Sequence, residues 1–222
     1  MACYDRVRHT FSEGRLESLV AARLAPGADK VAIDQRIWDL FGERWAVMFT
    51  DLSGFSRRVA EFGIVHFLQV IYESERLLVP VIEDHDGILL KVEGDSMLVV
   101  FRRPAKAVAC AFAMQTLLEG YNRGKDPSEQ VLLCVGVGYG DVLRIGDHDV
   151  FGAQVNAASK LGEDAAKAGE ILVTDAVEEE LRRTKGLRFV PVDAKPPGAK
   201  AAFRVEAARA TARRGARGRA RP

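Results

Sequence analysis

Two aspartates each stand where an apolar segment ends, and together they could hold a metal ion. Asp51 closes a segment that begins with the apolar run 45–49, which has the aromatic and β-branched character of a buried strand. Asp95 lies in the turn after a second apolar run, 87–92. Because a strand–helix–strand connection within one sheet makes the two strands parallel, both carboxylates should lie at the same edge. Paired carboxylates suit Mg²⁺ or Mn²⁺, whereas either residue alone would be explained as a helix cap or a turn residue.

The residues just after Asp51 could bind phosphate. A helix is expected to open at Ser53 and Gly54, and the first N–H groups of a helix have no partner within it. These N–H groups lie at the positive end of the helix dipole and can receive phosphate oxygens. The predicted phosphate-binding residues are Ser53, Gly54, Phe55 and Ser56.

The segments that position these residues alternate between helix and strand. Apolar spacing predicts helices at 16–24, 34–43, 64–84, 104–121, 152–161 and 175–183, with Gly63 separating a shorter helix from the one at 64–84. Apolar runs predict strands at 45–49, 87–92, 97–101, 131–143, 170–173, 187–192 and 202–205. The strands 87–92 and 97–101 form a hairpin. This order predicts an α/β fold (an α+β sandwich) with a ferredoxin-like βααββαβ core and C-terminal additions.

Composition divides the chain into one domain and two extensions. At 222 residues the chain can bury one good core, and 32 basic against 31 acidic residues give no overall nucleic-acid signature. Residues 1–44 form a helical extension and residues 45–206 the main domain. The tail 207–222 carries six arginines and no acid. We expect it to be disordered and solvated, although nucleic acid or an anionic membrane could use it.

The cysteines and the apolar runs indicate a soluble, cytoplasmic protein. Cys3, Cys110 and Cys134 are widely spaced and form neither a zinc pattern nor a disulfide frame. No apolar run is long enough to cross a bilayer, and the first residues contain no signal-like apolar core.

Three motifs resemble the catalytic motifs of class III nucleotidyl cyclases, and they occur in the family's order. The motifs are Phe-Thr-Asp-Leu-Ser-Gly-Phe-Ser (49–56), Lys-Val-Glu-Gly-Asp (91–95) and Gly-Ala-Gln-Val-Asn-Ala-Ala-Ser-Lys-Leu (152–161), and the similarity covers roughly residues 45–205. The resemblance implies that Asp51, Leu52 and Asp95 hold two Mg²⁺ or Mn²⁺ ions. It also implies a head-to-tail homodimer, in which the metal-binding residues of one subunit meet base-reading and transition-state residues of the other.

Lys91 and Asp149 stand at the positions that read the base in that family. Adenine presents an acceptor at N1 and a donor at N6; lysine can only donate and an ionised aspartate can only accept, so the pair matches adenine. Guanine presents the opposite pattern at N1 and O6. Because a mismatched buried polar group costs roughly 1–3 kcal/mol, the pair predicts a preference for ATP.

Asn156 and Lys160 stand four residues apart on a predicted helix and therefore share one face. By resemblance, Asn156 orients the ribose, and Lys160 stands where the family usually has an arginine that steadies charge on the α-phosphate. Lysine keeps the charge but lacks the planar fork that grips two oxygens. A phosphate-binding lysine near the end of the domain is also implied, and Lys195 and Lys200 are both candidates.

The motifs together predict an adenylate cyclase that converts ATP into 3′,5′-cyclic AMP and pyrophosphate. The alternative is a cyclase-like module that binds a nucleotide or dimerises in signalling with little or no turnover. Two departures from the family support this alternative: Lys160, and the short arm 140–146 before Asp149. A diguanylate cyclase would need a different hairpin motif from the Glu-Gly-Asp-Ser-Met at 93–97.

Overall fold

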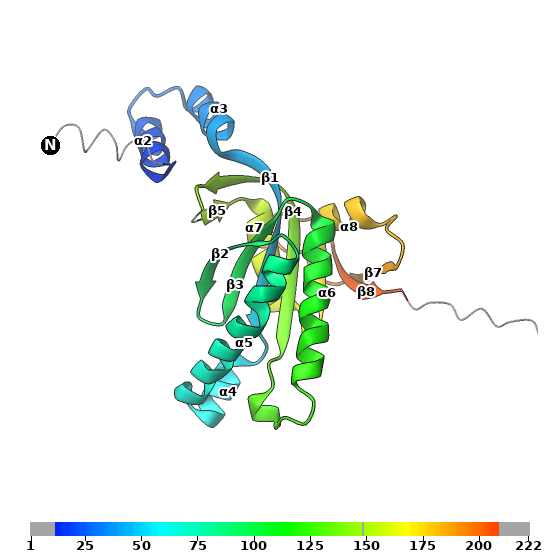
Figure 1. Cartoon of the computed structure of the whole chain (residues 1–222). Helices are drawn as coiled ribbons and strands as arrows, with labels where there is room; N and C mark the ends of the chain where they lie inside the picture. Colours follow the sequence, from blue (N-terminus) through cyan, green and yellow to red (C-terminus); the bar gives the residue numbers. More distant parts are fainter. Residues whose placement is uncertain (1–11, 148, 209–222) are drawn as a thin grey trace, which may run out of the picture.

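A mixed sheet of eight strands forms the centre of the molecule (Figure 1). The computed structural model describes residues 12–147 and 149–208. The strands are β1 (Gly42–Leu52), β2 (Ile88–Glu93), β3 (Ser96–Phe101), β4 (Leu133–Ile145), β5 (Asp149–Phe151), β6 (Ile171–Thr174), β7 (Leu187–Val192) and β8 (Ala202–Ala207). Their spatial order is β2-β3-β1-β4-β6-β8-β7, and β5 pairs with β4.

In the described part of the chain, nine helical segments surround the sheet or precede it, and two of them are not α-helices. The α-helices are α2 (Ser12–Leu24), α3 (Lys30–Phe41), α4 (Phe55–Phe62), α5 (Ile64–Asp84), α6 (Pro104–Tyr121), α7 (Ala153–Lys160) and α8 (Asp175–Leu181). A 3-10 turn, η1 (Pro127–Glu129), precedes β4, and a π-helical turn, η2 (Leu161–Ala165), continues α7. The order of elements from β1 to β4 is the predicted βααββαβ core.

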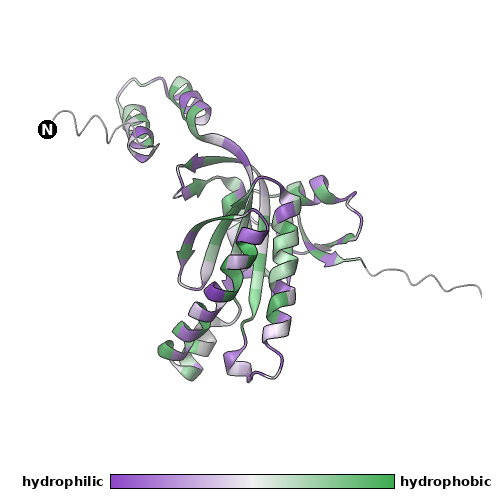
Figure 2. Ribbon diagram, in the orientation of Figure 1, coloured by the Kyte–Doolittle hydropathy of each residue, from purple (hydrophilic) through white to green (hydrophobic). Residues whose placement is uncertain are grey.

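The two faces of the sheet are covered by different helices. Ala46 and Met48 of β1 point into the main core, which contains residues of α5, α6 and α8, whereas Trp45 and Val47 point into a smaller cluster with Ala158 of α7. This alternation follows from the period of two in a β-strand. Figure 1 shows α5 and α6 on one side of the sheet and α7 on the other. Figure 2 shows that apolar residues dominate α6 and β4, whereas α5 alternates polar and apolar residues along its length.

β1 and β2 run in the same direction, as the strand–helix–strand argument predicted, but they are not neighbours. β3 lies between them and pairs antiparallel with each. The end of β1 and the end of β2 therefore still lie at the same edge of the sheet, which is what the argument about the aspartates requires.

Several element boundaries differ from the sequence prediction. The helix expected at 34–43 begins at Lys30, because Asp29 accepts a hydrogen bond from the N–H of Ala32 (3.1 Å) and caps it. It ends at Phe41, so Glu43 belongs to β1. The helix after Asp51 begins at Phe55 rather than Ser53, and Gly54 precedes it in a left-handed conformation (φ 80°). The short strand β5 and the turns η1 and η2 were not predicted.

The N-terminal helices pack on the domain through one small cluster. Leu19 of α2 and Ile37 and Phe41 of α3 bury their side chains against Ile145 at the end of β4. The described part of the chain leaves out residues 1–11, residue 148 and residues 209–222. The last of these ranges includes most of the predicted arginine-rich tail.

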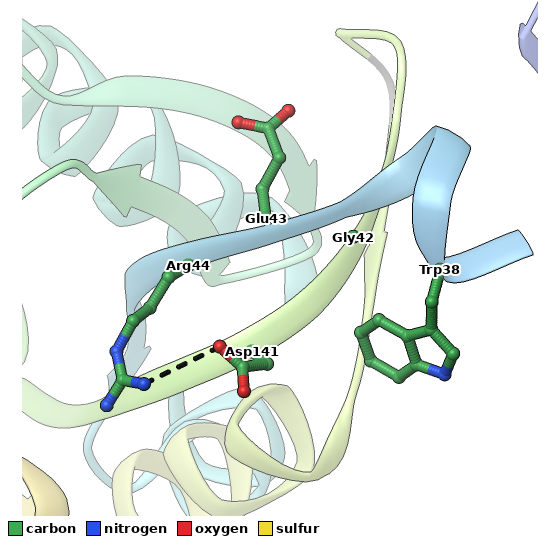
Figure 3. A pocket seen from close by; sticks show the side chains of 5 residues that line it. All are labelled: Trp38, Gly42, Glu43, Arg44 and Asp141. Atoms are coloured by element: carbon green, nitrogen blue, oxygen red, sulfur yellow. Dashed lines mark ion pairs between the residues drawn. The ribbon is translucent and has the colours of Figure 1, made fainter. Parts of the chain in front are cut away.

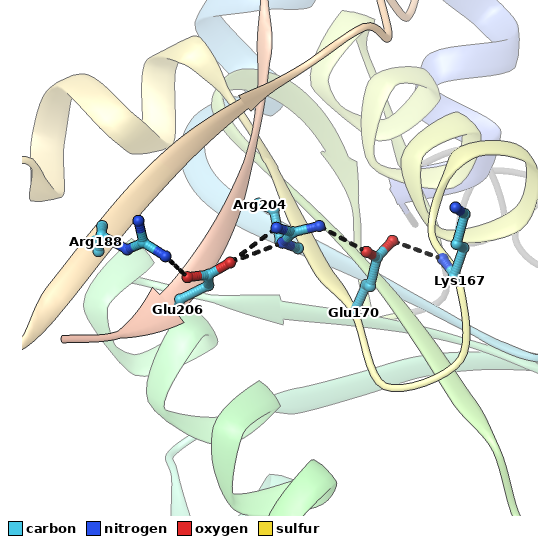
Figure 4. Close-up of polar contacts among 5 residues, drawn as sticks. All are labelled: Lys167, Glu170, Arg188, Arg204 and Glu206. Atoms are coloured by element: carbon cyan, nitrogen blue, oxygen red, sulfur yellow. Dashed lines mark hydrogen bonds and ion pairs between the residues drawn. The ribbon is translucent and has the colours of Figure 1, made fainter. Parts of the chain in front are cut away.

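Ion pairs join the last two strands to each other and to the residue that precedes β6. Arg204 of β8 contacts Glu170 (Nη1–Oε1 3.0 Å) and Glu206, and Glu206 also pairs with Arg188 of β7 (Figure 4). The other oxygen of Glu170 accepts a hydrogen bond from the N–H of Lys167 (3.0 Å). Exposed pairs of this kind contribute little individually, about 0–1 kcal/mol, so we assign them a role in aligning β7 and β8.

Candidate active site

The structure brings Asp51 and Asp95 together at one edge of the sheet. Thr50 of β1 pairs with Met97 of β3, so Asp51 lies beside Ser96. The Ser96 hydroxyl donates a hydrogen bond to Asp51 Oδ1 (3.3 Å). Oδ2 of Asp95, the neighbour of Ser96, is buried without a hydrogen-bond partner in this structure. A buried carboxylate oxygen without a partner is costly, and a cation at this position would offset the cost.

Both carboxylates have raised pKa values, and burial is the main cause for each. Burial, followed by the charge of Asp95, raises the pKa of Asp51 to about 7, and the hydrogen bond from Ser96 opposes the rise. Burial also raises the pKa of Asp95, against hydrogen bonds from its own backbone and from the backbone of Leu52. The contact with Leu52 ties the β2–β3 turn to the end of β1.

A divalent cation fits this pair if a substrate supplies the remaining ligands. The pair does not belong to a larger set of protein ligands, because residues 12–147 and 149–208 contain no group of three or more His, Cys, Asp or Glu side chains that could hold a metal ion. Mg²⁺ is commonly held by one or two carboxylates together with the phosphates of a substrate. The donor set of Asp51, Asp95 and the neighbouring backbone of Leu52 therefore matches a metal ion that arrives with a polyphosphate.

Two further carboxylates act on this pair through their charge, and no pattern in the sequence indicates them. Glu163 and Asp164 belong to η2, and both add to the negative potential that raises the pKa of Asp51. η2 can approach β1 because Gly162 lacks a side chain: a Cβ there would lie 2.9 Å from the carbonyl oxygen of Phe49. The Glu-Asp sequence after Lys160 carried no periodic signal, and only the π-helical turn brings it near the strand end.

The start of α4 differs from its predicted role in one respect. The N–H of Ser53 donates to the carbonyl oxygen of Leu132 (2.8 Å) and is therefore not free for phosphate. The backbone N–H groups of Gly54, Phe55 and Ser56 remain candidates at the start of this eight-residue helix.

Lys91 and Asp149, the predicted base-reading pair, are neighbours. Lys91 Nζ lies 3.4 Å from Asp149 Oδ2, although 58 positions separate the residues in the sequence. The nitrogen also lies 3.0 Å from Oε1 of Glu93. The hydrogen bond to Glu93, followed by the charge of Asp149, raises the pKa of Lys91, which keeps it a donor.

The base-reading pair and the aspartates share one face of the sheet. The register pairs Phe49 with Leu98 and Leu98 with Lys91, so the three side chains form a row across β1, β3 and β2. Leu98 packs in the cluster that contains Ala158, so this is the face on which α7 lies. Asp51, two residues beyond Phe49, lies on the same face.

α7 presents Asn156 and Lys160 to solvent. Ala157 and Ala158 are buried against the sheet, whereas Asn156 and Lys160 are exposed, as the four-residue spacing predicted. Lys160 Nζ contacts Asp164 Oδ2 (2.8 Å), and the pair raises the pKa of Lys160. Lys160 is therefore held near the carboxylates of η2 by its own chain.

Gln154, which the sequence motifs did not single out, joins α7 to three other segments. Its Oε1 accepts hydrogen bonds from the N–H of Tyr139 (3.1 Å) and the hydroxyl of Thr174 (3.2 Å), and its Nε2 donates to the carbonyl oxygen of Gly198 (2.9 Å). Gly198 lies between Lys195 and Lys200, the two predicted phosphate-binding lysines. Both lysines are exposed, and both belong to the segment that Gln154 fastens to the start of α7.

A separate cavity lies away from the predicted site residues. It measures about 370 Å³ and is lined by Trp38, Gly42, Glu43, Arg44 and Asp141, where α3 leads into β1 (Figure 3). Arg44 and Asp141 form an ion pair across one side (3.6 Å), and Glu43 points away from them. None of the predicted site residues lines this cavity, so we do not assign the chemistry to it.

Comparison with known proteins identifies the family. Residues 42–199 match the adenylate and guanylate cyclase catalytic domain, and the chain belongs to this family. It is 34% identical over 131 residues to the serine/threonine-protein kinase pkn2 of Myxococcus xanthus, covering 59% of this chain and 16% of the kinase. It is 32% identical over 190 residues to an adenylate cyclase of Mycobacterium bovis, covering 78% of this chain and 41% of that protein.

The fold is also that of solved cyclases. An adenylate/guanylate cyclase/hydrolase from Silicibacter pomeroyi superposes with a TM-score of 0.60 at 24% identity, over 74% of this chain and 95% of the other. The predicted fold class, an α+β sandwich like that of class III cyclases, is thereby confirmed. The chain spans less than half the length of the curated relatives that it matches. Among the described helices, none combines the length and the apolar character needed to span a membrane.

Proposed function

We propose that this protein is an adenylate cyclase, which converts ATP into 3′,5′-cyclic AMP and pyrophosphate. The contact between Lys91 and Asp149 carries the proposal. It places a donor beside an acceptor, 3.4 Å apart, on the face of the sheet that also holds Asp51. That order of hydrogen-bonding groups fits N1 and N6 of adenine and opposes N1 and O6 of guanine.

The residues of this chain would then divide the work as follows. Asp51, Asp95 and the backbone of Leu52 would hold Mg²⁺ or Mn²⁺, which lowers the pKa of the 3′-hydroxyl and neutralises the triphosphate. The N–H groups at the start of α4 and a lysine of the segment 193–200 would bind phosphate oxygens. Asn156 would orient the ribose, and Lys160 would stabilise the charge that develops on the α-phosphate.

The site would be completed in a homodimer. Asn156 and Lys160 are exposed on α7, and Lys91 and Asp149 are partly exposed, so a second copy could approach all four. Head-to-tail association would bring the aspartates of one subunit to the base-reading residues of the other.

A catalytically weak nucleotide-binding module remains the second candidate, and two observations favour it. Lys160 is paired with Asp164 rather than free. In addition, Ile145 pairs directly with Asp149, so the hairpin between β4 and β5 is too short to extend far over a partner. The adenylate cyclase is preferred because the base-reading pair and the aspartates occur together.

One assay separates the two candidates. Purified protein is incubated with Mn²⁺ and either ATP or GTP, and cyclic nucleotide is quantified; Asp95→Ala is the inactive control. Cyclic AMP from ATP, abolished in the control, supports the enzyme. Binding of ATP without product supports the module, and preferential formation of cyclic GMP contradicts the assignment of the base.

A further inference from the structure

Lys91 lies between two carboxylates, of which only Asp149 has a place in the recognition of the base. The second is Glu93, two residues further along β2, whose Oε1 is 3.0 Å from Lys91 Nζ. This distance is shorter than the 3.4 Å to Asp149. We propose that Glu93 positions Lys91 and thereby sets the preference for adenine over guanine. The inference rests on the proposed function.

Lysine needs such a partner because its side chain is long and flexible. The side chain of Lys91 is 40% exposed, and an exposed lysine samples many rotamers. Asp149 is already fixed: its Oδ1 accepts a hydrogen bond from the N–H of Val150 (2.9 Å), which leaves Oδ2 toward Lys91. Glu93, whose side chain is 67% exposed, restricts Lys91 through its 3.0 Å ion pair.

Without Glu93, the two base-reading residues would satisfy each other. Asp149 would be the remaining carboxylate of the cluster, so Lys91 would move toward it and the pair would tighten. An adenine base would then have to break a stronger ion pair before it could bind. Glu93 holds Lys91 back and keeps both hydrogen-bonding positions open.

The cavity beside Lys91 includes Glu93 in the same wall. It measures about 70 Å³ and is lined by Phe49, Lys91, Glu93, Ser96 and Leu98. Phe49 and Leu98 give it apolar walls, and Lys91 and Glu93 give it convergent polar groups, which is the usual composition of a ligand site. Ser96 connects it to Asp51 through the 3.3 Å hydrogen bond.

The donor and the acceptor that Glu93 keeps open match only one of the two bases. Asp149 Oδ2 can accept from the N6 amino group of adenine and Lys91 can donate to its N1, whereas guanine presents an acceptor at O6 and a donor at N1. Removal of Glu93 would therefore weaken binding of ATP and relax the discrimination against GTP.

The test compares Glu93→Gln with wild type and with Glu119→Gln, which removes an exposed carboxylate on α6. The measurements are kcat and KM for ATP and GTP with Mn²⁺, and calorimetric binding of the α,β-methylene analogues of both nucleotides. Glu93→Gln should lower the ATP-to-GTP ratio of kcat/KM by about 3- to 5-fold, mainly through the KM for ATP, because the lost ion pair is partly exposed. Glu93→Asp should restore part of the ratio, and Glu119→Gln should leave it unchanged.

A second comparison shows whether Glu93 acts through Lys91. In a Lys91→Ala background, Glu93→Gln should change the ratio less than about twofold. An unchanged ratio in Glu93→Gln, or the same fall in the Lys91→Ala background, would overturn the inference while leaving the proposed function intact. If the wild type itself neither discriminates between the analogues nor makes cyclic AMP, the proposed function fails and the inference with it.

Discussion

At the scale of single residues, Lys160 is the position where this chain departs most clearly from the class III pattern. Its ammonium group supplies one charge where a guanidinium would supply a planar fork, and Asp164 competes for that charge at 2.8 Å. If the exposed face of α7 meets the α-phosphate, the missing second hydrogen bond weakens transition-state stabilisation more than binding.

We expect Lys160→Arg to raise the rate of cyclic AMP formation by about 10- to 100-fold, because a charge-assisted hydrogen bond is worth roughly 1.5–3 kcal/mol. The KM for ATP should change little, and Lys160→Ala should lower the rate further. The measurement is the initial rate at saturating Mn²⁺ and ATP. Equal rates in all three proteins would show that Lys160 does not reach the reacting phosphate.

The base-reading pair gives a second prediction at the same scale. Changing Lys91→Glu together with Asp149→Cys replaces the donor with an acceptor and removes the charged acceptor, so the preference for ATP should fall or reverse. The measurement is kcat/KM for both nucleotides. The matched control is Lys106→Glu with Asp141→Cys, which alters the same residue types away from Lys91. A double variant at 91 and 149 that keeps the full preference for ATP would contradict the assignment.

Asp51 gives a prediction about stability rather than activity. Its pKa in the folded chain is raised to about 7 from the ordinary value of 3.8, so the folded state binds more protons than the unfolded state between these values. Stability of the metal-free protein therefore falls as pH rises through this window and stays low above it. Asp51→Asn removes the penalty, so the gain in free energy of unfolding should grow from about pH 4 to pH 7.

The expected gain at pH 8 is about 1–3 kcal/mol, after allowance for the partial exposure of the side chain. Urea denaturation in EDTA at several pH values measures it, with Asp84→Asn, an exposed carboxylate at the end of α5, as the control. A gain that does not depend on pH would show that burial and the charge of Asp95 do not perturb Asp51.

At the scale of elements, the approach of α7 and η2 to the sheet depends on glycine. A Cβ at Gly136 of β4 would lie 2.1 Å from the carbonyl oxygen of Ala158 and 2.5 Å from the backbone nitrogen of Gly162. Both atoms belong to the backbone and cannot rotate away. Any side chain at residue 136 would therefore push η2, with Glu163 and Asp164, away from the end of β1.

Gly136→Ala should destabilise the protein by about 2–4 kcal/mol and disturb the site. Gly120→Ala is the matched control, because nothing lies within 4 Å of a Cβ at that position on α6. The control should stabilise the protein by about 0.5–1 kcal/mol, since alanine has a higher helix propensity than glycine. Thermal and urea unfolding measure both. A Gly136→Ala protein as stable as wild type would show that the backbone of η2 does not pack closely against β4.

At the scale of the whole molecule, the arrangement of site residues on one face of the sheet predicts an active site that two subunits share. The main core covers the other face with α5 and α6, whereas Asp51, Lys91 and the exposed side of α7 all border the less covered face. A second copy on this face would close the site from both sides.

Asp51→Ala and Asn156→Ala should therefore each be inactive alone, and a mixture should recover part of the activity. A heterodimer would contain one site with neither substitution, so recovery to about a quarter of the wild-type rate is expected if subunits exchange at random. Size-exclusion chromatography of tagged subunits confirms the exchange. A mixture that exchanges and stays inactive would place the whole site within one chain.

The sequence by itself determined the elements and the identity of the chemical groups. The sequence predicted α5 and α6 at their observed bounds for different reasons: α5 has a clear apolar face, whereas α6 opens with Pro104 and is apolar over most of its surface. The strand-end position of Asp51, the turn position of Asp95 and the shared face of Asn156 and Lys160 follow from local geometry alone. The family's motifs added Lys91 and Asp149, which no local pattern would have paired.

Only the tertiary structure decided which of these groups meet. The contact of Lys91 with Asp149 depends on the hairpin from β4 to β5, and the latter strand, with three residues, is too short to leave a periodic signal. The Ser53 N–H is bonded to Leu132 because of where β4 begins. The charges of Glu163 and Asp164 act on Asp51 because Gly136 and Gly162 let η2 approach the sheet closely. Each of these contacts joins segments far apart in the chain, and local propensity carries no information about such pairs.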